Sequence, residues 1–215
     1  WPETASRYAA MVTMIDRQLG ELLTLLKQLG IAENTLVMFS SDNGTTHLEK
    51  EVDYEFFESV GPLRGLKGSL YEGGIRVPFI VRWPGVIKPG SVSDALIQNI
   101  DYAPTFLDAA GLPIPGDTQG ESLLPFMEGR SPSNWRESVY YHYYEFPGWH
   151  DVRRHYGVRT DRHKLIHYYD IGEWELFDLQ ADPDELKSVH DDPKYADVRK
   201  ELEVELARLR KECGA

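Results

Sequence analysis

Residues 35–44 read Thr35-Leu36-Val37-Met38-Phe39-Ser40-Ser41-Asp42-Asn43-Gly44, an apolar run that ends in an acidic and an amide side chain. An all-apolar run of this length is typical of a buried parallel strand. Open α/β sheets bind their ligands at the carboxyl ends of such strands. The stretch therefore predicts an α/β fold with a ligand site directly after this strand.

The Asn43-Gly44 pair also has a simpler interpretation, because Asn-Gly is a strong signal for a hairpin turn. A hairpin needs a second strand soon after the turn, whereas residues 45–68 are polar, glycine-rich and poor in alternation. We therefore favour a metal site in which the Asp42 carboxylate and the Asn43 amide oxygen are ligands. Calcium is the better candidate and magnesium the weaker one, because calcium accepts neutral amide oxygens and irregular geometry more readily.

A basic, glycine-rich segment follows at residues 61–78 and contains Lys67. The default interpretation of a single lysine is a solvated surface loop. Neighbouring glycines allow close backbone approach, however, and a compact ammonium suits a tetrahedral oxyanion. The segment thus predicts an anion site beside the cation, with Lys67 as its ligand. Arg76 is expected to pair with Glu72 instead.

The overall composition limits the classes of function. The 215 residues are 41% hydrophobic and carry a net charge of −12 at pH 7, which permits a real core but argues against a nucleic-acid or anionic-membrane partner. No run of about 18 apolar residues occurs, so no membrane span is predicted. The single cysteine, Cys213, excludes an internal disulfide framework and a cysteine-based zinc site.

The order of elements predicts two regions. A helix over 8–29, strands over 35–41 and 77–83, and a helix over 101–110 with Asp101 as its N-cap are expected in an α/β region. A stretch rich in proline and glycine follows and places the boundary between domains 1–133 and 134–215. The second region has short aromatic-rich segments separated by turn residues, which is typical of an antiparallel sheet. These segments are 138–146, 156–159, 164–169 and 174–179, and Asp192-Pro193 opens a final helix.

An aromatic cluster spans residues 140–156. Its tyrosines are expected to pack within the sheet. Trp149 and His150 are harder to bury and fall in a predicted loop, where binding residues are common, so we expect His150 to contact the substrate. The same cluster could instead belong to a non-catalytic carbohydrate-binding module.

Together these motifs resemble the type I, formylglycine-dependent sulfatases of the alkaline-phosphatase-like superfamily. The resemblance implies the C-terminal part of an α/β sulfatase domain followed by a small α+β subdomain with an antiparallel sheet and a C-terminal helix. It also implies hydrolysis of sulfate esters, commonly of a sulfated sugar. The motifs that carry it are 8–16, 40–44, 61–68, 71–78 and 83–85, and 156–160, 164–165, 175–179 and 182–183 resemble the family's C-terminal subdomain.

The resemblance implies roles for matching residues. Asp42 and Asn43 would be two ligands of a calcium ion that also binds the sulfate. Lys67 would contact the sulfate and help to neutralise charge that develops on oxygen. His47 stands where relatives often place a pocket histidine, as a proton donor or substrate contact, although a solvated loop histidine fits equally well. Most bacterial members are exported, so a periplasmic or secreted location is expected.

The chain also departs from the family pattern. The formylglycine nucleophile of the family is made from the cysteine of a Cys-x-Pro-x-Arg motif, which this chain lacks, because Cys213 has neither the proline nor the arginine after it. The Asp191-Asp192 pair is better explained as a helix cap than as the family's upstream metal ligands. We therefore expect a C-terminal fragment with half of an active site, an N-terminal part missing, and no turnover by the fragment alone. A phosphate or phosphonate ester hydrolase of the same superfamily is the alternative.

Overall fold

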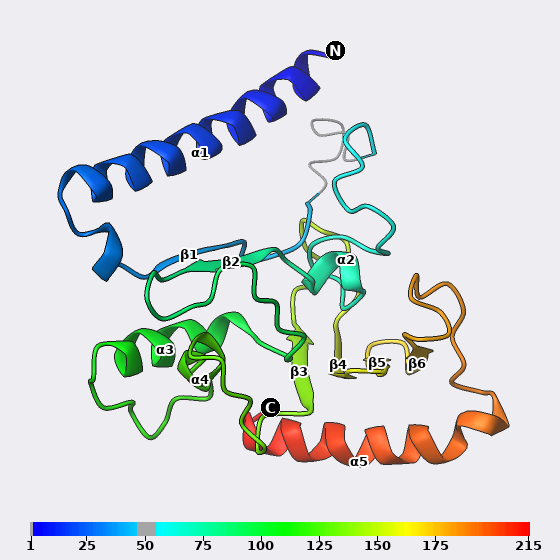
Figure 1. The fold of residues 1–215 in the computed structure, drawn as a ribbon. Coiled ribbons are helices and arrows are strands. Elements are labelled where there is room, and N and C mark those ends of the chain that lie inside the picture. The colour runs from blue at the N-terminus through cyan, green and yellow to red at the C-terminus, as the bar shows by residue number, and fades with distance from the viewer. Residues whose placement is uncertain (1, 47–54) are drawn as a thin grey trace.

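The computed structural model describes residues 2–46 and 55–215 (Figure 1). A long helix and a two-stranded sheet form one part of the molecule, and a four-stranded sheet with one helix across it forms another. The first part contains α1 (Glu3–Gln28), η1 (Ala32–Asn34), β1 (Val37–Ser40), α2 (Glu72–Ile75), β2 (Phe79–Arg82), η2 (Asn99–Asp101), α3 (Tyr102–Ala109) and α4 (Leu124–Met127). The second contains β3 (Ser138–Tyr143), β4 (His155–Thr160), β5 (His163–Tyr168), β6 (Glu173–Asp178), η3 (Pro193–Tyr195) and α5 (Ala196–Glu212).

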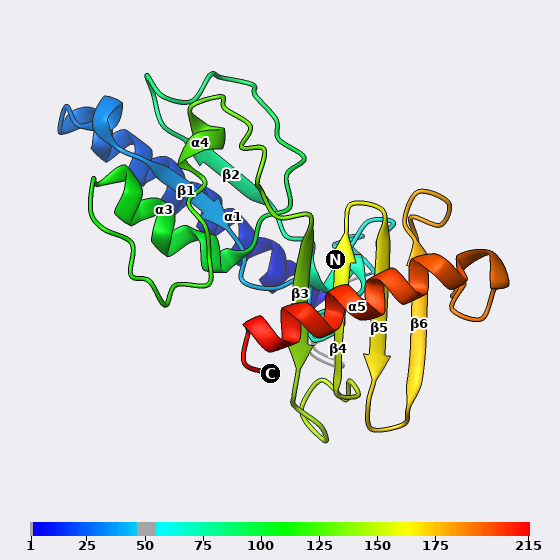
Figure 2. The same cartoon turned by 90° about the horizontal axis from the view of Figure 1, so that it is seen from below.

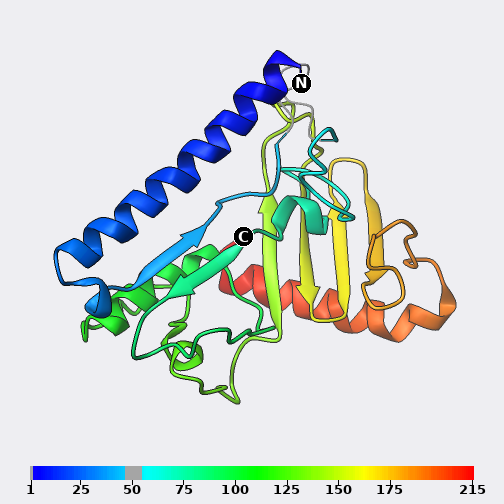
Figure 3. The same cartoon turned by 45° about the horizontal axis from the view of Figure 1, so that its top comes forward.

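Helix α1 confirms the predicted amphipathic helix and begins a few residues earlier than the apolar stripe indicates. It ends at Gln28, and Gly30 follows the C-cap Leu29 with a φ of +69°, a left-handed conformation that glycine adopts without steric cost. The helix extends away from the rest of the fold in Figures 1 and 3 and lies behind β1 in the view of Figure 2. Much of its apolar stripe is exposed, for example Met11, Ile15 and Leu22.

Strands β1 and β2 confirm the two predicted strands of the first region. They pair antiparallel, with Val37 opposite Arg82 and Ser40 opposite Phe79. The expectation that β1 is a fully buried parallel strand was therefore wrong within the described residues. An apolar run does not determine whether the neighbouring strand runs parallel or antiparallel to it. Here residues 41–78 separate the two strands, and β2 then runs antiparallel to β1.

Asp101 is buried and occupies the predicted N-cap position of α3, but its side chain makes no capping hydrogen bond to that helix and instead completes a capping box with Gln98 in η2. Its carboxylate accepts hydrogen bonds from the backbone N–H groups of Gln98 and Glu121 at 2.8 and 2.9 Å. It also accepts two from the Arg136 guanidinium at 2.6 and 2.7 Å. The carboxylate binds these groups rather than the first N–H groups of α3, because a bidentate arginine forms strong hydrogen bonds with a buried carboxylate. Asp101 thus joins the segment around α3 to the start of β3.

The second region forms the antiparallel sheet that the aromatic segments predict, and its four strands are arranged as a meander in the order β3-β4-β5-β6. Helix α5 lies across one of its faces (Figure 2). The core between them is formed by Val158, Leu165 and Leu176 of the sheet and by Leu202, Leu206 and Leu209 of the helix. Asp192 accepts a hydrogen bond from the Lys194 N–H at 3.0 Å at the turn that leads into α5, which confirms the predicted cap.

The opposite face of this sheet carries the glycine-rich segment of the first region. Leu70 packs against Ile166 and Phe177, and Tyr71 joins the same cluster. Gly157 of β4 permits this contact, because a Cβ atom there would lie 2.3 Å from the Leu70 side chain. The sheet is therefore the platform on which the segment that contains Lys67 rests. The boundary proposed between residues 133 and 134 stays a prediction.

Within residues 2–46 and 55–215, no helix combines the length and the apolar character that crossing a membrane requires.

Candidate functional site

The predicted metal ligands lie in the loop that follows β1. Asp42 is exposed and Asn43 is half-buried. The Ser41 hydroxyl donates to the Asn43 carbonyl at 2.8 Å, which closes a tight turn. Among the described residues, none forms a hydrogen bond or an ion pair with the Asp42 carboxylate. The turn therefore presents a free carboxylate beside an amide.

Two backbone hydrogen bonds connect this loop to the glycine-rich segment. The Gly44 N–H donates to the Gly74 carbonyl at 3.0 Å, and the Lys67 N–H donates to the Thr45 carbonyl at 2.8 Å. The approach is close enough to require glycine, since a Cβ atom on Gly44 would lie 2.0 Å from the Gly73 carbonyl oxygen. The fold thus brings the predicted metal residues and the predicted anion residue into one site.

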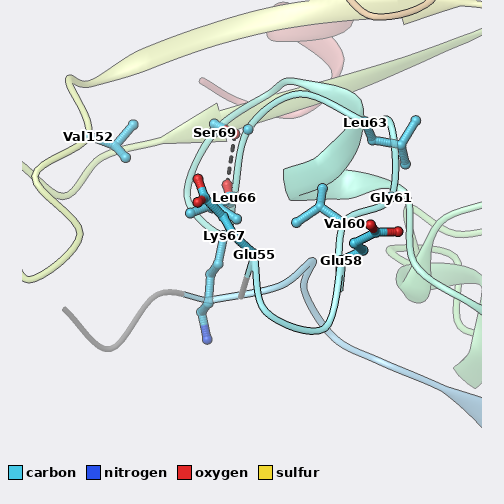
Figure 4. Close-up of a pocket in the computed structure, with 10 residues that line it drawn as sticks. Glu55, Glu58, Val60, Gly61, Leu63, Leu66, Lys67, Ser69 and Val152 are labelled. Carbon is cyan, nitrogen blue, oxygen red and sulfur yellow. Dashed lines mark hydrogen bonds between the residues drawn. The ribbon is translucent and has the colours of Figure 1, made fainter. Parts of the chain in front are cut away.

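Lys67 also lines a cavity of about 570 Å³ (Figure 4). The walls combine apolar side chains such as Val60 with the carboxylates of Glu55 and Glu58. The Lys67 side chain points away from Leu63 in this view. A polar molecule of moderate size could therefore bind with one end against the cavity wall and another near the Lys67 ammonium.

The predicted specificity loop, between β3 and β4, reaches the same region. Val152 lines the cavity, and its side chain lies 3.5 Å from where a Cβ atom of Gly68 would be. His150, two residues earlier, is half-buried and does not line the described cavity. Trp149 is 67% exposed. The structure places the loop, rather than His150 itself, beside Lys67, and the substrate contact of His150 stays a prediction.

His47 lies outside the described residues. Across the described ranges, no group of three or more histidine, cysteine, aspartate or glutamate side chains is placed to hold a metal ion. Asp42 and Asn43 thus supply two oxygen donors, and this part of the chain brings no third carboxylate or imidazole to them.

The tyrosines of β3 pack within the sheet, as predicted. Tyr140 packs against the core under α5, and Tyr141 packs on the opposite face against the cluster around Leu70. His155, fully buried, stacks on Tyr141 with ring centroids 5.8 Å apart. Burial lowers the pKa of His155, so the ring is held neutral.

Sequence reasoning missed a buried ionic cluster behind the Lys67 segment. Lys164 is fully buried, and its ammonium lies 2.8 Å from Glu72 and 2.6 Å from Glu185. Arg159 contacts Glu72 at 3.3 Å. The predicted Arg76–Glu72 pair is present at 3.9 Å, but Arg76 is largely exposed and is the more distant partner.

The surroundings shift the pKa values of the two carboxyl groups of this cluster in opposite directions. Burial acts to raise the pKa of Glu72, but Lys164 and Arg159 outweigh it and the pKa is lowered. Burial raises the pKa of Glu185, with Lys164 opposing it. One sequence signal pointed to the cluster: strand alternation places Lys164 on the same face as Ile166, which is a buried face.

Comparison with known proteins places the chain in a family. Residues 3–112 match the family model described as sulfatase, and residues 66–212 match the model described as N-sulphoglucosamine sulphohydrolase, C-terminal. The N-acetylglucosamine-6-O-sulfatase of Bacteroides thetaiotaomicron is 44% identical over 198 residues, which are 91% of this chain and 33% of that protein. Human arylsulfatase K is 35% identical over 85% of this chain and 32% of its own length. The chain spans about a third of the length of these curated relatives.

Solved structures of related enzymes share the fold of this chain. A protein in complex with its substrate D-glucosamine-2-N,6-O-disulfate is 40% identical with a TM-score of 0.83, over 95% of this chain and 40% of that one. The phosphonate monoester hydrolase of Agrobacterium radiobacter is 28% identical with a TM-score of 0.75, over 95% of this chain and 40% of its own. The two family models together cover nearly all of residues 1–215, and this chain belongs to the sulfatase family.

Proposed function

We propose that residues 1–215 are the C-terminal part of a sulfatase that hydrolyses a sulfate ester of an amino sugar. The observation that carries the proposal is the pair of backbone hydrogen bonds that joins the Asp42–Asn43 loop to the Lys67 segment. Support for the substrate class comes from two relatives, one named N-acetylglucosamine-6-O-sulfatase and one solved with a glucosamine disulfate. The nucleophile, a formylglycine, and the remaining metal ligands would come from an N-terminal part of the same protein.

Asp42 and Asn43 fit a calcium ion better than a magnesium ion. An exposed carboxylate without a described partner and a neighbouring amide oxygen are hard donors, and calcium tolerates the amide and an irregular shell. A calcium ion bound there would offset the negative charge of the sulfate oxygens. The two residues supply only part of the shell that such an ion needs.

Lys67 would bind the sulfate group directly. Its ammonium is a compact charge that stabilises negative charge as it develops on oxygen while the ester S–O bond breaks. The bond from the Lys67 N–H to the Thr45 carbonyl fixes the backbone from which this side chain extends, so less reorganisation is needed during the reaction. His47 would donate a proton or contact the substrate.

The sugar would occupy the cavity that adjoins Lys67. The loop between β3 and β4 contributes Val152 to its wall, and we assign His150 of this loop as a substrate contact. We also propose that the parent protein is periplasmic or secreted, a proposal that rests on the resemblance to exported bacterial sulfatases.

The decisive experiment uses the full-length parent and N-acetylglucosamine 6-sulfate. Asp42→Ala should abolish measurable turnover and also weaken calcium binding measured by titration calorimetry on metal-free protein. Asp94→Ala, which removes an exposed carboxylate from a loop, is the matched control and should change neither. Near-normal turnover by the Asp42→Ala protein would contradict the assignment, as would unchanged calcium binding.

A phosphonate or phosphate ester hydrolase is the second candidate, because a phosphonate monoester hydrolase is among the structural relatives. Paired aryl sulfate, phosphate and phosphonate esters separate the two on the full-length parent. A sulfatase should show the highest kcat/KM on the sulfate. The isolated residues 1–215 should hydrolyse none of them, whereas a carbohydrate-binding module would bind saccharide by itself and in the presence of a chelator.

A further inference from the structure

The ionic cluster behind the Lys67 segment has no assigned purpose. Its central residue, Lys164, extends from β5 into the interface between the four-stranded sheet and the segment 61–78, and its ammonium reaches both Glu72 and Glu185. Such a cluster is weak evidence for stability, because apolar side chains of similar size often serve as well or better in its place. A role in fixing one particular conformation is the better-supported use of buried ionic groups.

The contacts of Glu185 are concentrated on the glycine-rich segment. One of its carboxylate oxygens accepts from the Glu72 backbone N–H at 2.7 Å, and the other accepts from Lys164. Its own carbonyl accepts from the Arg64 guanidinium. Glu185 adopts a φ of +54°, a conformation that residues other than glycine rarely adopt, so its placement is specific.

Arg64 and Glu72 stand on either side of Lys67 in the sequence, and the backbone closes between them. The Gly73 N–H donates to the Arg64 carbonyl at 2.8 Å, which makes residues 64–73 a loop with a closed base. The cluster therefore holds both sides of that base, while Lys67 lies at its far end. A shift of the base would move Lys67 relative to the Asp42–Asn43 loop.

We propose that Lys164 and Glu185 are positioning residues, which hold the loop of residues 64–73 in one conformation against the four-stranded sheet. The sheet would then contribute to the sulfate site by keeping Lys67 in place. The proposal rests on the proposed function, since it gives Lys67 its catalytic meaning. Neither residue touches the substrate. Their effect passes through the backbone of residues 64–74 and through the bond between Gly44 and Gly74.

The test uses the full-length parent with the double substitution Lys164→Met and Glu185→Leu. This variant removes the buried ion pair without leaving one charge unpaired, and Glu72 keeps Arg159 as its partner. We expect a folded protein in which kcat on N-acetylglucosamine 6-sulfate falls about 10- to 100-fold, the scale of a small misplacement, while KM changes little. Amide hydrogen exchange of residues 66–74 should rise about tenfold, as local opening becomes easier.

The matched control is Leu165→Ala, next to Lys164 on β5 but facing α5. It weakens the same strand from the other side, so a purely structural effect would appear there too. The control should lower thermal stability while kcat and the exchange of residues 66–74 stay within about twofold at a temperature well below unfolding. Glu185→Gln, a milder change, should give an intermediate kcat.

Two results would overturn the proposal: a folded double variant with unchanged kcat, whatever its hydrogen exchange, or an equal loss of kcat in Leu165→Ala. A wild-type parent without sulfatase activity would instead count against the proposed function. The exchange comparison would still decide whether the cluster holds the Lys67 loop, because it requires no substrate.

Discussion

The backbone N–H of Lys67 donates to the carbonyl oxygen of Thr45 at 2.8 Å. The two residues lie on separate segments, one after β1 and one in the glycine-rich loop on the C-terminal sheet. This bond, with its neighbour between Gly44 and Gly74, makes the Asp42–Asn43 turn and the Lys67 loop a single unit. Substitutions in the full-length parent can test that unit and the framework around it.

Replacing Lys67 tests the sulfate contact. Lys67→Ala should lower kcat about 100- to 1000-fold, the cost of losing one group that stabilises a developing oxyanion. Steady-state kinetics on N-acetylglucosamine 6-sulfate provide the measurement. Lys88→Ala removes an exposed lysine on a loop after β2 and should leave kcat unchanged. A Lys67→Ala enzyme within threefold of wild type would rule out the catalytic role.

Gly44 tests the close approach between the two loops. Gly44→Ala would place a Cβ atom 2.0 Å from the Gly73 carbonyl oxygen, so the loops must separate. We expect a loss of about 1–3 kcal/mol in unfolding free energy, the usual scale of overpacking. Turnover should fall with it. Gly20→Ala on α1, where a Cβ meets nothing within 4 Å, should stabilise the helix by about 1 kcal/mol; denaturant titration that gives the same result for both would contradict the structure.

The buried pair of Asp101 and Arg136 should carry a large share of the stability around α3. Arg136→Met removes the one cation that is paired with the fully buried Asp101 carboxylate among the described residues, together with the two hydrogen bonds that it donates. The expected cost is about 3–5 kcal/mol, as for other buried pairs that lose one member. Arg130→Met breaks the exposed pair with Glu128 and should cost no more than about 1 kcal/mol. Urea unfolding of both variants checks the contrast, and equal costs would count against it.

Because His155 is buried, we expect the unfolding free energy of the protein to fall in mild acid. Burial lowers the pKa of this ring in the folded state, so the unfolded chain binds the proton first as pH falls below about 6.5. The contribution of neutral His155 to the unfolding free energy is therefore fully present above about pH 6.5. It is lost as the pH falls from there toward the lowered pKa of the folded state. His155→Phe should flatten the decline in unfolding free energy between pH 6.5 and 5. An unchanged pH profile would show that His155 does not titrate in this way.

The carboxylates in the cavity wall predict a charge preference. Glu55 and Glu58 line the space beside Lys67 and should disfavour a second sulfate on the sugar. Glu58→Gln should therefore raise kcat/KM for a disulfated glucosamine relative to the 6-sulfate alone, by no more than about threefold because solvent screens the charge of this exposed side chain. The ratio of the two specificity constants is the readout. A ratio that stays the same or falls would place the second sulfate elsewhere.

Local periodicity and turn residues were enough to predict helix α1, the strands of both sheets, the antiparallel character of the second sheet and the final helix α5. It also singled out Asp42, Asn43 and Lys67 from their residue types and neighbours. Local patterns failed where a partner lay far along the chain. The Asp101 side chain, expected to cap α3, binds Arg136 instead. Strand β1, expected to be parallel to its neighbour, pairs antiparallel with β2.

The fold was needed to bring Asp42, Asn43 and Lys67 into one site, because two backbone hydrogen bonds between distant segments create it. The same holds for Lys164, whose partners Glu72 and Glu185 lie on opposite sides of it in sequence. Burying an ammonium is costly unless carboxylates meet it, and which carboxylates do so depends on how the sheet and the glycine-rich loop pack. Residue type can indicate chemistry, but the distances that make it a site come from packing.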